Sequence, residues 1–594
     1  MSYRAPIRDL GFTLKHVLGL EELQATGVYP DLDADLVDAV LEAAGQVAEG
    51  TLAPLNVPGD RAGARLEGDG VIPAPGFAEA YQTFVEGGWM GLAAPVAHGG
   101  QGLPKALELA AYEPVHSANM AFGLCPMLSL AAIEALEAHG TEAQKETYLT
   151  RLISGEWTGA MVLTEPNAGS DLGALTATAT PNGDGTYSLT GQKIFITWGD
   201  HDMTDNIVHM VLARLPDAPP GPKGISLFLA PKYLVNDDGS LGERNAFRPV
   251  GVEHKLGIHA SPTCVMAYEG ATAELVGRPN EGLAHMFVMM NAARVAVGVE
   301  GVGIAERAYQ HALAYASDRR QGRSVWTGEA SAPILDHPDV RRSLSVMKAK
   351  VAAGRAICLA TGMAADLARS SADADVARQW KGREDLLTPI AKAWATDMGV
   401  EVASMGVQIH GGMGFIEETG AAQYYRDARI APIYEGTNGI QAMDLVGRKL
   451  SQDGGASARL LIEEMKTVLT PLAALYDGKP VERMANALSA VEDATLWLLD
   501  RKAAEDGTAD VLAAADAYLK LMGDVIGGWF LARGALAAQA LKANGEGDTE
   551  WLDGRITLYE VYAANVLGHV SSRLAAIGQG GDLLLRMTPA VLAP

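Results

Sequence analysis

Cysteine is scarce in this chain. Its 594 residues include only Cys125, Cys264 and Cys358, which lie far apart in sequence. This small number excludes a disulfide framework and cysteine-based zinc spacing. His201 and Asp202 are of metal-ligating types, but no third ligand stands at a suitable spacing. We therefore expect a loop there and no metal site.

Basic residues are also few: 47 Lys and Arg stand against 72 Asp and Glu, a formal net charge of −25. This balance opposes binding to a phosphate backbone, so we expect no nucleic-acid partner. An anionic small ligand would have to be bound by arginines and lysines gathered locally. Individual arginines are therefore more informative here than the net charge.

No apolar run reaches the ~20 residues that a membrane span requires. The longest, Met120 to Ile133, ends at Glu134, which favours a buried helix. The N-terminal segment mixes Asp9, Glu21 and Glu22 with its basic residues and lacks an apolar signal core. We therefore expect no membrane span and a cytoplasmic location.

The hydrophobic pattern changes twice along the chain. Asp33 to Val47 and Met120 to Leu152 have helical periodicity. Thr158 to Gly277 consists of short β-type runs such as KIFIT and GISLFLAP, divided by turn sequences such as PNGDG. Helical patterns return from Asn280. The chain is thus predicted to be α+β, with an N-terminal extension (1–36), a helical domain (37–157), an antiparallel β-domain (158–279), a second helical domain (280–450) and a helical extension (451–594).

The C-terminal extension begins with SQDGGAS, Ser451 to Ser457. Further on, Met484, Leu488, Val491 and Leu498 lie on one helical stripe. The polar faces of this extension are not rich in basic residues, so packing or dimerisation is favoured over a membrane-surface role.

One carboxylate stands at a structural junction within RDARIAPIYEGTNGIQAMDLVGRKL, Arg426 to Leu450. Glu435 follows Tyr434 and precedes Gly436 and Thr437, residues suited to a turn and a helix start. An acid held there can face a cleft and act as a base. An isolated Glu-Gly-Thr is also compatible with a solvated loop acid, so other blocks must agree.

Five blocks together resemble the acyl-CoA dehydrogenase family of flavoenzymes. In the family's IYEGT-type sequence the glutamate, here Glu435, abstracts a proton from the substrate. The resemblance runs from about Asp33 to Leu450 and implies FAD as cofactor and dehydrogenation of an acyl-CoA to the trans-2-enoyl-CoA. The other blocks follow in the family's order: MVLTEPNAGSDLGAL at Met161 to Leu175, GQKIFIT at Gly191 to Thr197, DRRQGR at Asp318 to Arg323, and QIHGGMGF at Gln408 to Phe415.

Desaturation of a thioester requires a base for the Cα proton and an acceptor for the hydride of Cβ. Glu435 can supply only the base, and the resemblance names the flavin N5 as the acceptor. A carboxylate covered by flavin and thioester loses water, which raises its pKa. The resemblance also implies an oxyanion hole for the thioester oxygen, made by the Glu435 backbone N–H and a ribityl hydroxyl of FAD.

The resemblance assigns further contacts residue by residue. Phe195 stands where many members have a tryptophan on the flavin, and Asn291 where they have an aspartate. Arg319 corresponds to the arginine that reaches the FAD pyrophosphate of the neighbouring subunit, but the family's following Phe-Gly pair is missing. The assigned cofactor-binding residues are Leu163, Thr164, Gly169, Ser170, Phe195, Thr197, Arg319, Gln408, Gly411, Gly412, Gly414 and Thr437; the assigned substrate-binding residues are Ser170, Asn291, Arg294, Tyr434 and Gly436.

The opening MSYRAPIRDLGFTLKHVL, the segment EHKLGIHASPTCVM at Glu253 to Met266 and the long extension look closest to the 3-methylmercaptopropionyl-CoA dehydrogenase type of the family. One methylene or sulfur in an apolar pocket changes binding by only ~1–3 kcal/mol, so short and medium acyl-CoAs stay open as substrates. An acyl-CoA oxidase and a non-catalytic acyl-CoA-binding protein are the alternative functions.

The resemblance further implies two partners. Electron-transferring flavoprotein is the expected electron acceptor, and a second copy of the chain is expected in a homodimer. We expect the extension to cover the surface through which shorter members pair dimers into tetramers.

Overall fold

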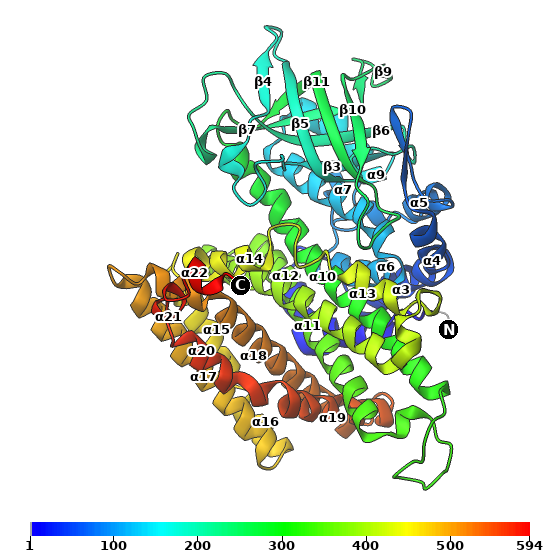
Figure 1. Ribbon diagram of the computed structural model, residues 1–594, viewed down its shortest axis with the longest axis vertical. Coiled ribbons are helices and arrows are strands. Elements are labelled where there is room, and N and C mark those ends of the chain that lie inside the picture. The colour runs from blue at the N-terminus through cyan, green and yellow to red at the C-terminus, as the bar shows by residue number, and fades with distance from the viewer. Residues whose placement is uncertain (1–2) are drawn as a thin grey trace.

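The computed structural model describes residues 3–594. A β-rich lobe stands above a set of long helices, and the C-terminal helices run along one side of these (Figure 1). The predicted α+β class, with helical parts on both sides of a β-region and an extra helical part at the C-terminus, is confirmed.

The helices before the β-lobe form where the periodicity predicts them. The Asp33 side chain accepts a hydrogen bond from the Leu36 N–H and starts α3. The elements are α1 (Ile7–Phe12), α2 (Leu20–Gln24), α3 (Ala34–Val47), α4 (Ala53–Ala62), the hairpin β1 (Arg65–Glu67) and β2 (Gly70–Ile72), α5 (Phe77–Glu86), α6 (Lys105–Ala118), α7 (Met120–His139), α8 (Glu142–Gln144) and α9 (Thr150–Ser154).

The helix α7 is longer than its apolar run suggested, because it continues through Glu134 to His139. By length and composition, α7, α10 (Gly282–Asp318) and α11 (Pro338–Ser370) could each cross a membrane. Most of each apolar window is nevertheless buried inside the protein, 89% of it in α7. The helix that contains the run Met120 to Ile133 is thus long enough to span, contrary to expectation, but the expected buried helix is confirmed. The absence of a membrane span stays a prediction.

The β-lobe is mostly antiparallel, as predicted, but two of its strand pairings are parallel. Strand β6 pairs parallel with β3 and, through one residue pair, with β4, while the other pairs are antiparallel. Strands β11, β5, β4, β6 and β7 pair in a closed ring. The strands are β3 (Trp157–Val162), β4 (Thr178–Pro181), β5 (Tyr187–Thr197), β6 (Asn206–Arg214), β7 (Ile225–Pro231), β8 (Tyr233–Val235), β9 (Leu241–Arg244), β10 (Phe247–Val252) and β11 (Thr263–Val276).

Three long helices form the centre of the second helical part. Close approaches of Gly298 to Ala391 and of Gly406 to Ala308 show that α10 and α12 run side by side in the same direction. The small residues allow these two backbones to come close together. The helices are α10, α11, α12 (Ala374–His410), α13 (Ala421–Ala428) and α14 (Asn438–Asp444).

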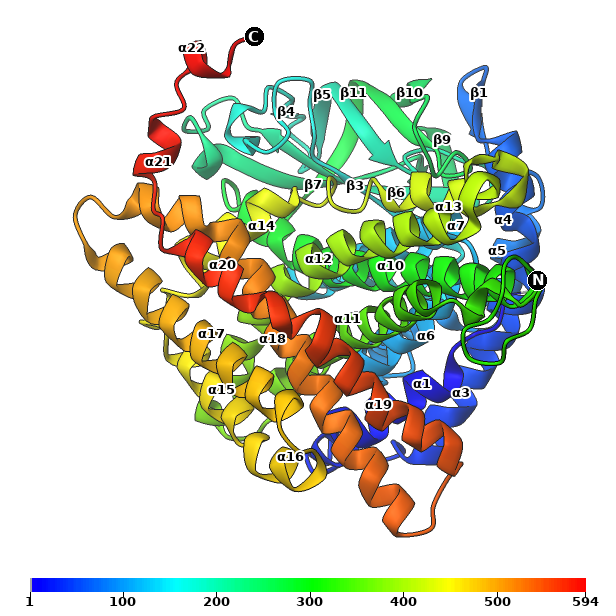
Figure 2. The same ribbon diagram turned by 60° about the horizontal axis from the view of Figure 1, so that its bottom comes forward.

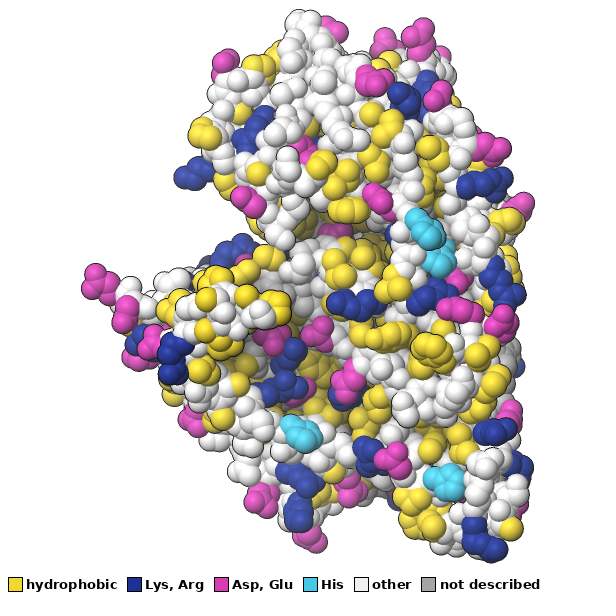
Figure 3. All heavy atoms as spheres, viewed as in Figure 1, with side chains coloured by type: hydrophobic (Ala, Val, Ile, Leu, Met, Phe, Trp, Pro, Cys, Tyr) yellow, Lys and Arg dark blue, Asp and Glu magenta, His cyan; other side chains and the backbone are white. Residues whose placement is uncertain are grey.

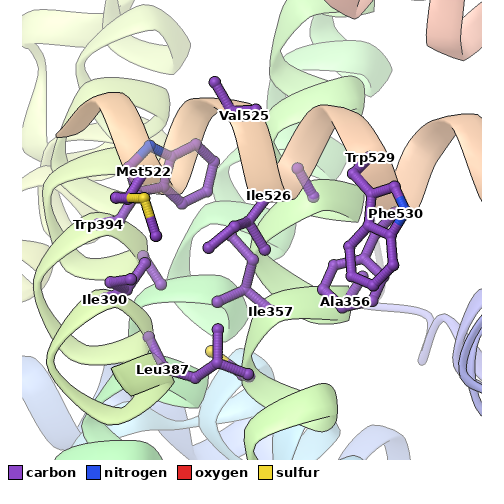
Figure 4. Packing of buried hydrophobic residues seen from close by; sticks show 14 of the residues in the cluster. Ala356, Ile357, Leu387, Ile390, Trp394, Met522, Val525, Ile526, Trp529 and Phe530 are labelled. Atoms are coloured by element: carbon purple, nitrogen blue, oxygen red, sulfur yellow. The ribbon is translucent and has the colours of Figure 1, made fainter. Parts of the chain in front are cut away.

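The extension packs on this bundle. Figure 4 shows Met522, Ile526 and Phe530 of α18 facing residues of α11 and α12. The Trp394 indole also donates a hydrogen bond to Asp524 at 2.9 Å. The extension comprises α15 (Ala456–Lys466), α16 (Leu469–Leu475), α17 (Lys479–Ala503), α18 (Thr508–Ala543), α19 (Thr549–Asn565), α20 (Val570–Ile577), α21 (Asp582–Leu585) and α22 (Pro589–Leu592).

The N-terminal segment lies beside the extension, with α19 close to α1 (Figure 2). Asp9 forms ion pairs with Lys348 of α11 and, at 3.0 Å, with Arg555 of α19. Phe12 packs edge-on against Trp551, with ring centroids 5.1 Å apart. The two ends of the chain therefore support each other and the central bundle.

Candidate active site

Glu435 lies in a strained loop just before α14. Its φ of 56° is in the left-handed region, which costs a non-glycine residue roughly 1 kcal/mol or more. The side chain is partly exposed, and its carboxylate makes no hydrogen bond or ion pair to any of residues 3–594. Figure 3 shows a deep cleft between the β-lobe and the helices below it, and α14 lies on the lower rim of this cleft (Figure 1). A free carboxylate is thus presented beside a cleft.

Neighbouring side chains hold the loop by its carbonyl groups. Arg294 Nε donates to the Glu435 carbonyl at 3.4 Å, and Gln441 Nε2 donates to the same oxygen at 3.1 Å. The buried Lys392 Nζ donates to the Gly436 carbonyl at 2.9 Å and to Asn438 Oδ1 at 2.9 Å. These donors fix the backbone and leave the carboxylate of Glu435 free.

The environment makes Glu435 a stronger base than an ordinary glutamate. Although the residue is partly exposed, the surrounding protein atoms remove water from its carboxyl group and raise its pKa to about 7, while the nearby charges of Arg294 and Lys392 lower it. A carboxyl group whose pKa lies near neutral pH can both accept a proton and release it again. The geometry and the proton affinity therefore suit a general base.

The residues that follow Glu435 shape the turn. Gly436 has a φ of 81°, and a Cβ there would come within 2.8 Å of Gln441 Nε2. Thr437 is the N-cap of α14, and its hydroxyl accepts from the Ile440 N–H at 3.3 Å. The contact of Thr437 with a cofactor and that of Gly436 with a substrate stay predictions.

The sequence interpretation missed two buried ionisable groups beside this loop. Lys392 and Glu300 are both fully buried, and the Tyr434 hydroxyl donates to Glu300 Oε2. Burial lowers the pKa of Lys392 to about 7, although the charge of Glu435 opposes this change. Glu300 is the only charged residue of the stretch VAVGVEGVG, and Lys392 is the only charged residue of the stretch LLTPIAKAWA. A single charge on a buried helical face was the signal that could have found them.

The predicted substrate residues Asn291 and Arg294 lie one turn apart on α10. Arg294 is buried and also lies 3.8 Å from Asp444. Asn291 Oδ1 is buried and has no hydrogen-bond partner within the described part of the chain. Such an atom can accept a hydrogen bond from a bound ligand. Its role in substrate binding stays a prediction.

Two of the predicted flavin blocks are joined by a buried ion pair. Lys193 Nζ lies 2.9 Å from Glu165 Oε1 and donates to the Leu163 carbonyl at 2.9 Å. The Ile194 N–H donates to the Thr164 carbonyl at 2.9 Å. The loop after β3 is thereby attached to β5, so TEPNAGSD and GQKIFIT form one structural unit.

This unit presents exposed groups to solvent. Gly169 and Ser170 are exposed in the loop, whereas Leu163 and Thr164 are partly buried. Phe195 sits at a β-bulge of β5 with a φ of 59°, and 59% of its surface is exposed. Thr197, the last residue of β5, is partly exposed. A strained, exposed aromatic ring at a β-bulge is suited to covering by a planar ring.

The remaining predicted cofactor residues lie far from Glu435 in the same chain. Arg319 follows the end of α10, 25 residues after Arg294, which corresponds to about 38 Å along the helix. Gln408 lies 16 residues after Lys392 on α12, about 24 Å away. Gly411, Gly412 and Gly414 follow in a short 3₁₀ segment, where Gly414 is buried and the other two are exposed.

Arg319, Gln408 and these glycines meet at one end of the bundle, because α10 and α12 run in the same direction. His410 joins the two helices there by stacking on Tyr315 and His311, with ring centroids 4.4 and 4.6 Å apart. The Arg319 side chain is exposed and has no partner among residues 3–594, whereas Arg320 bonds to the Ser331 carbonyl and to Glu329. These residues therefore lie far from Glu435 within one chain, and their contact with a cofactor stays a prediction.

No group of three or more His, Cys, Asp and Glu side chains that could hold a metal occurs among the described residues. His201, which was considered for such a site, is buried and shares a hydrogen bond of 2.9 Å with Thr158.

The residues present fit FAD. The exposed Phe195 ring, the exposed loop of Gly169 and Ser170 and the cleft beside Glu435 suit a flavin, and the exposed Arg319 suits a pyrophosphate. Arg319 lies at the other end of the bundle from Glu435.

Comparison with known proteins agrees with this geometry. Four family models match successive parts of the chain: the acyl-CoA dehydrogenase N-terminal domain at residues 39–156, the middle domain at 160–271, the C-terminal domain at 280–450, and the "Acetyl-CoA dehydrogenase C-terminal like" domain at 461–588. The last of these shows that the extension has its own counterpart in related proteins.

Full-length relatives are also found. The chain is 48% identical to 3-methylmercaptopropionyl-CoA dehydrogenase of Ruegeria pomeroyi, over 98% of this chain and 99% of the relative. It is 34% identical to the broad-specificity linear acyl-CoA dehydrogenase FadE5 of Mycobacterium tuberculosis, over 96% of each chain. Among solved structures, the acyl-CoA dehydrogenase of Bacillus anthracis complexed with FAD has the same fold, with a TM-score of 0.74 at 22% identity over 94% of this chain and 91% of that one. The chain therefore belongs to the acyl-CoA dehydrogenase family, whose members use FAD to dehydrogenate acyl-CoA thioesters.

Proposed function

We propose that Glu435 is the base that removes the Cα proton of the acyl-CoA. The observation that carries this assignment is the free carboxylate, held in a strained loop beside the cleft with its pKa raised to about 7. The chain holds the loop through Arg294, Gln441 and Lys392, so the carboxylate is oriented before the substrate arrives.

In the proposed reaction the substrate loses a proton from Cα to Glu435 and a hydride from Cβ, which leaves a trans-2-enoyl-CoA. Bound FAD supplies the acceptor for that hydride. Phe195, Thr197 and the loop of Gly169 and Ser170 would hold the flavin, with Asn291 and Arg294 beside the substrate. The proton on Glu435 returns to solvent after the product leaves.

Replacement of Glu435 by Gln tests the base. The amide preserves the shape of the side chain but cannot accept the proton, so we expect the variant to retain FAD, bind acyl-CoA and lose anaerobic flavin bleaching by at least about 10³-fold. Near-normal bleaching by Glu435→Gln would show that another group is the base.

For the substrate we propose a short acyl-CoA, with 3-methylmercaptopropionyl-CoA as the preferred one. The support is the Ruegeria pomeroyi relative, which matches the whole chain at 48% identity and bears that name. Bleaching rates with 3-methylmercaptopropionyl-CoA, butyryl-CoA and octanoyl-CoA compare the candidates directly. A higher kcat/KM for octanoyl-CoA would contradict the proposal.

We further propose a homodimer in which Arg319 and the segment from Gln408 to Gly414 of one chain complete the cofactor site of the other. The support is their position at the opposite end of the bundle from Glu435. Arg319→Ala should therefore weaken FAD retention, whereas Arg320→Ala, whose side chain is bonded within its own loop, should not. A monomer with tightly bound FAD in light scattering would contradict the shared site.

The proposed electron acceptor is an electron-transferring flavoprotein. An acyl-CoA oxidase would pass its electrons to oxygen and release one peroxide for each turnover. Peroxide measured during turnover in air therefore separates the two functions, and a stoichiometric yield would identify an oxidase.

A further inference from the structure

Glu300 is an acid in the interior of the protein, on the face of α10 that meets the Glu435 loop. Its side chain is fully buried. Tyr434 Oη donates to Glu300 Oε2, and Glu300 Oε1 has no hydrogen-bond partner within residues 3–594. Burial of a carboxyl group with one oxygen that lacks a hydrogen bond is unfavourable. Another interaction must therefore offset this free-energy cost.

Glu300 is mostly neutral near pH 7. Burial raises its pKa to about 8, and the negative charge of Glu435 adds to the rise, although the hydrogen bond from Tyr434 opposes it. Because the pKa of this acid is raised, the neutral form dominates below about pH 8. A neutral carboxyl group still offers a carbonyl oxygen to the Tyr434 hydroxyl.

The Tyr434 hydrogen bond anchors the loop directly before the strained residue. On the other side of Glu435, the anchors are the bonds from Lys392 and Gln441 to the Gly436 carbonyl. A left-handed non-glycine conformation persists only when its surroundings fix it from both sides. Without the Tyr434 anchor, these side-chain bonds would hold the loop only from the Glu435 carbonyl onward.

We propose that Glu300 is a positioning residue, which holds the Glu435 carboxylate in its reactive orientation through Tyr434. Glu300 itself is fully buried and bonds to Tyr434, so in this proposal it acts through the tyrosine and touches no reacting atom. A displacement of about 1 Å of the base can slow a proton transfer about 10²-fold, which gives the anchor a measurable effect. This inference rests on the proposal that Glu435 is the base.

The test compares four variants by single-turnover flavin reduction under anaerobic conditions. Glu300→Gln keeps an acceptor for Tyr434, whereas Glu300→Leu and Tyr434→Phe each remove the hydrogen bond. We expect Glu300→Gln to remain within about twofold of the wild-type rate and the other two to lose about tenfold. The double variant Glu300→Leu/Tyr434→Phe should lose no more than either single variant, since both remove the same bond.

Two further measurements separate positioning from a general loss of structure. FAD content should stay within about twofold of wild type in all four variants, and the substrate dissociation constant should do so in Glu300→Gln and Glu300→Leu, so that the loss in Glu300→Leu appears in the reduction rate. Glu306→Gln is the matched control, because Glu306 is also a buried acid of α10 but bonds to Arg355, away from the loop. The Glu306→Gln variant should change the free energy of unfolding and leave the flavin-reduction rate of the folded enzyme unchanged.

A wild-type reduction rate in Glu300→Leu with full FAD content would overturn the inference. So would an equal loss in Glu300→Gln and Glu300→Leu, because the hydrogen bond would then be irrelevant. Glu435→Gln is measured in parallel. If that variant reduces its flavin normally, the proposed base is wrong; if it is inactive while Glu300→Leu is normal, only the role of Glu300 is wrong.

Discussion

Lys193 Nζ lies 2.9 Å from Glu165 Oε1 in the interior of the β-lobe, and this pair connects the loop that follows β3 to strand β5. Glu165 also accepts hydrogen bonds from the Thr176 N–H at 2.7 Å and the Ala177 N–H at 3.0 Å, where the loop ends. The loop therefore bends around one carboxylate, which fixes both of its ends. This carboxylate thereby supports the exposed Gly169 and Ser170 of the loop.

Replacing Lys193 by Met should loosen the loop and weaken FAD binding. Removal of the ammonium leaves the Glu165 carboxylate buried without its cation, at a cost of about 3–5 kcal/mol. We expect a purified Lys193→Met protein to contain clearly less FAD, measured by absorbance at the flavin band. Lys223→Met, at an exposed lysine of the same lobe, is the control and should keep its FAD. Full FAD content in Lys193→Met would show that the pair does not support the cofactor.

The reaction should depend on pH through Glu435. A base acts only when it is ionised, and the pKa of this carboxyl is raised to about 7, so it is protonated below that pH. We expect kcat/KM to fall about tenfold for each pH unit below about pH 6.5 and to reach a plateau above neutral pH, until other groups titrate. Rapid-mixing measurements of flavin reduction give this profile. A rate that stays constant down to about pH 5 would contradict the raised pKa.

Lys392→Met should shift the fall in kcat/KM at acid pH to higher pH. The Lys392 charge lowers the pKa of Glu435, so its removal allows the pKa to rise further. We expect kcat/KM at pH 7 to fall about fivefold, with smaller effects at pH 8.5. Lys381→Met is the control, because Lys381 lies on the same helix with an exposed side chain. An unchanged pH for this fall in Lys392→Met would show that its cation does not influence the base.

The charge cluster around Asp9 should contribute to stability. Burial opposes ionisation of Asp9, but Lys348, Arg555 and Arg355 outweigh it and hold the pKa well below its usual range. The lowered pKa means that the stabilisation is fully present above about pH 4 and is lost as the pH falls further. We expect Asp9→Asn to lower the free energy of unfolding by about 3 kcal/mol at pH 7, measured with urea. Asp31→Asn, at an exposed aspartate, should change it by less than about 0.5 kcal/mol.

Deletion of the extension from Ser451 onward should produce aggregates or higher oligomers. The deletion would expose the face of α11 and α12 that packs on α18, including Ile357, Ile390 and Trp394 (Figure 4). Truncation after Gly578 is the control, because it removes only a tail whose leucines are already exposed. Size-exclusion chromatography with light scattering compares the oligomeric states of the two shortened proteins. A well-behaved dimer without the extension would show that covering this surface is not needed to prevent further association.

Much of the molecule was readable from the sequence because local patterns determine it. The N-cap Asp33 and the apolar positions after it specify α3, and the stripe of Met484, Leu488 and Val491 becomes the buried face of α17. Such patterns depend on the 3.6-residue helical period, which is a local property. The family blocks likewise pointed to Glu435 and its turn, because a strained loop requires particular neighbours in sequence.

Only the tertiary structure decided which distant residues meet. The parallel pairing of β3 with β6 depends on a long connection between them, so β-type runs alone could not distinguish a mixed sheet from an antiparallel one. Lys392 and Glu300 read as isolated charges in apolar helices, and only the packing of α10 and α12 places them against the Glu435 loop. The free energy of a buried charge depends on its partners in space, and no local pattern specifies those partners.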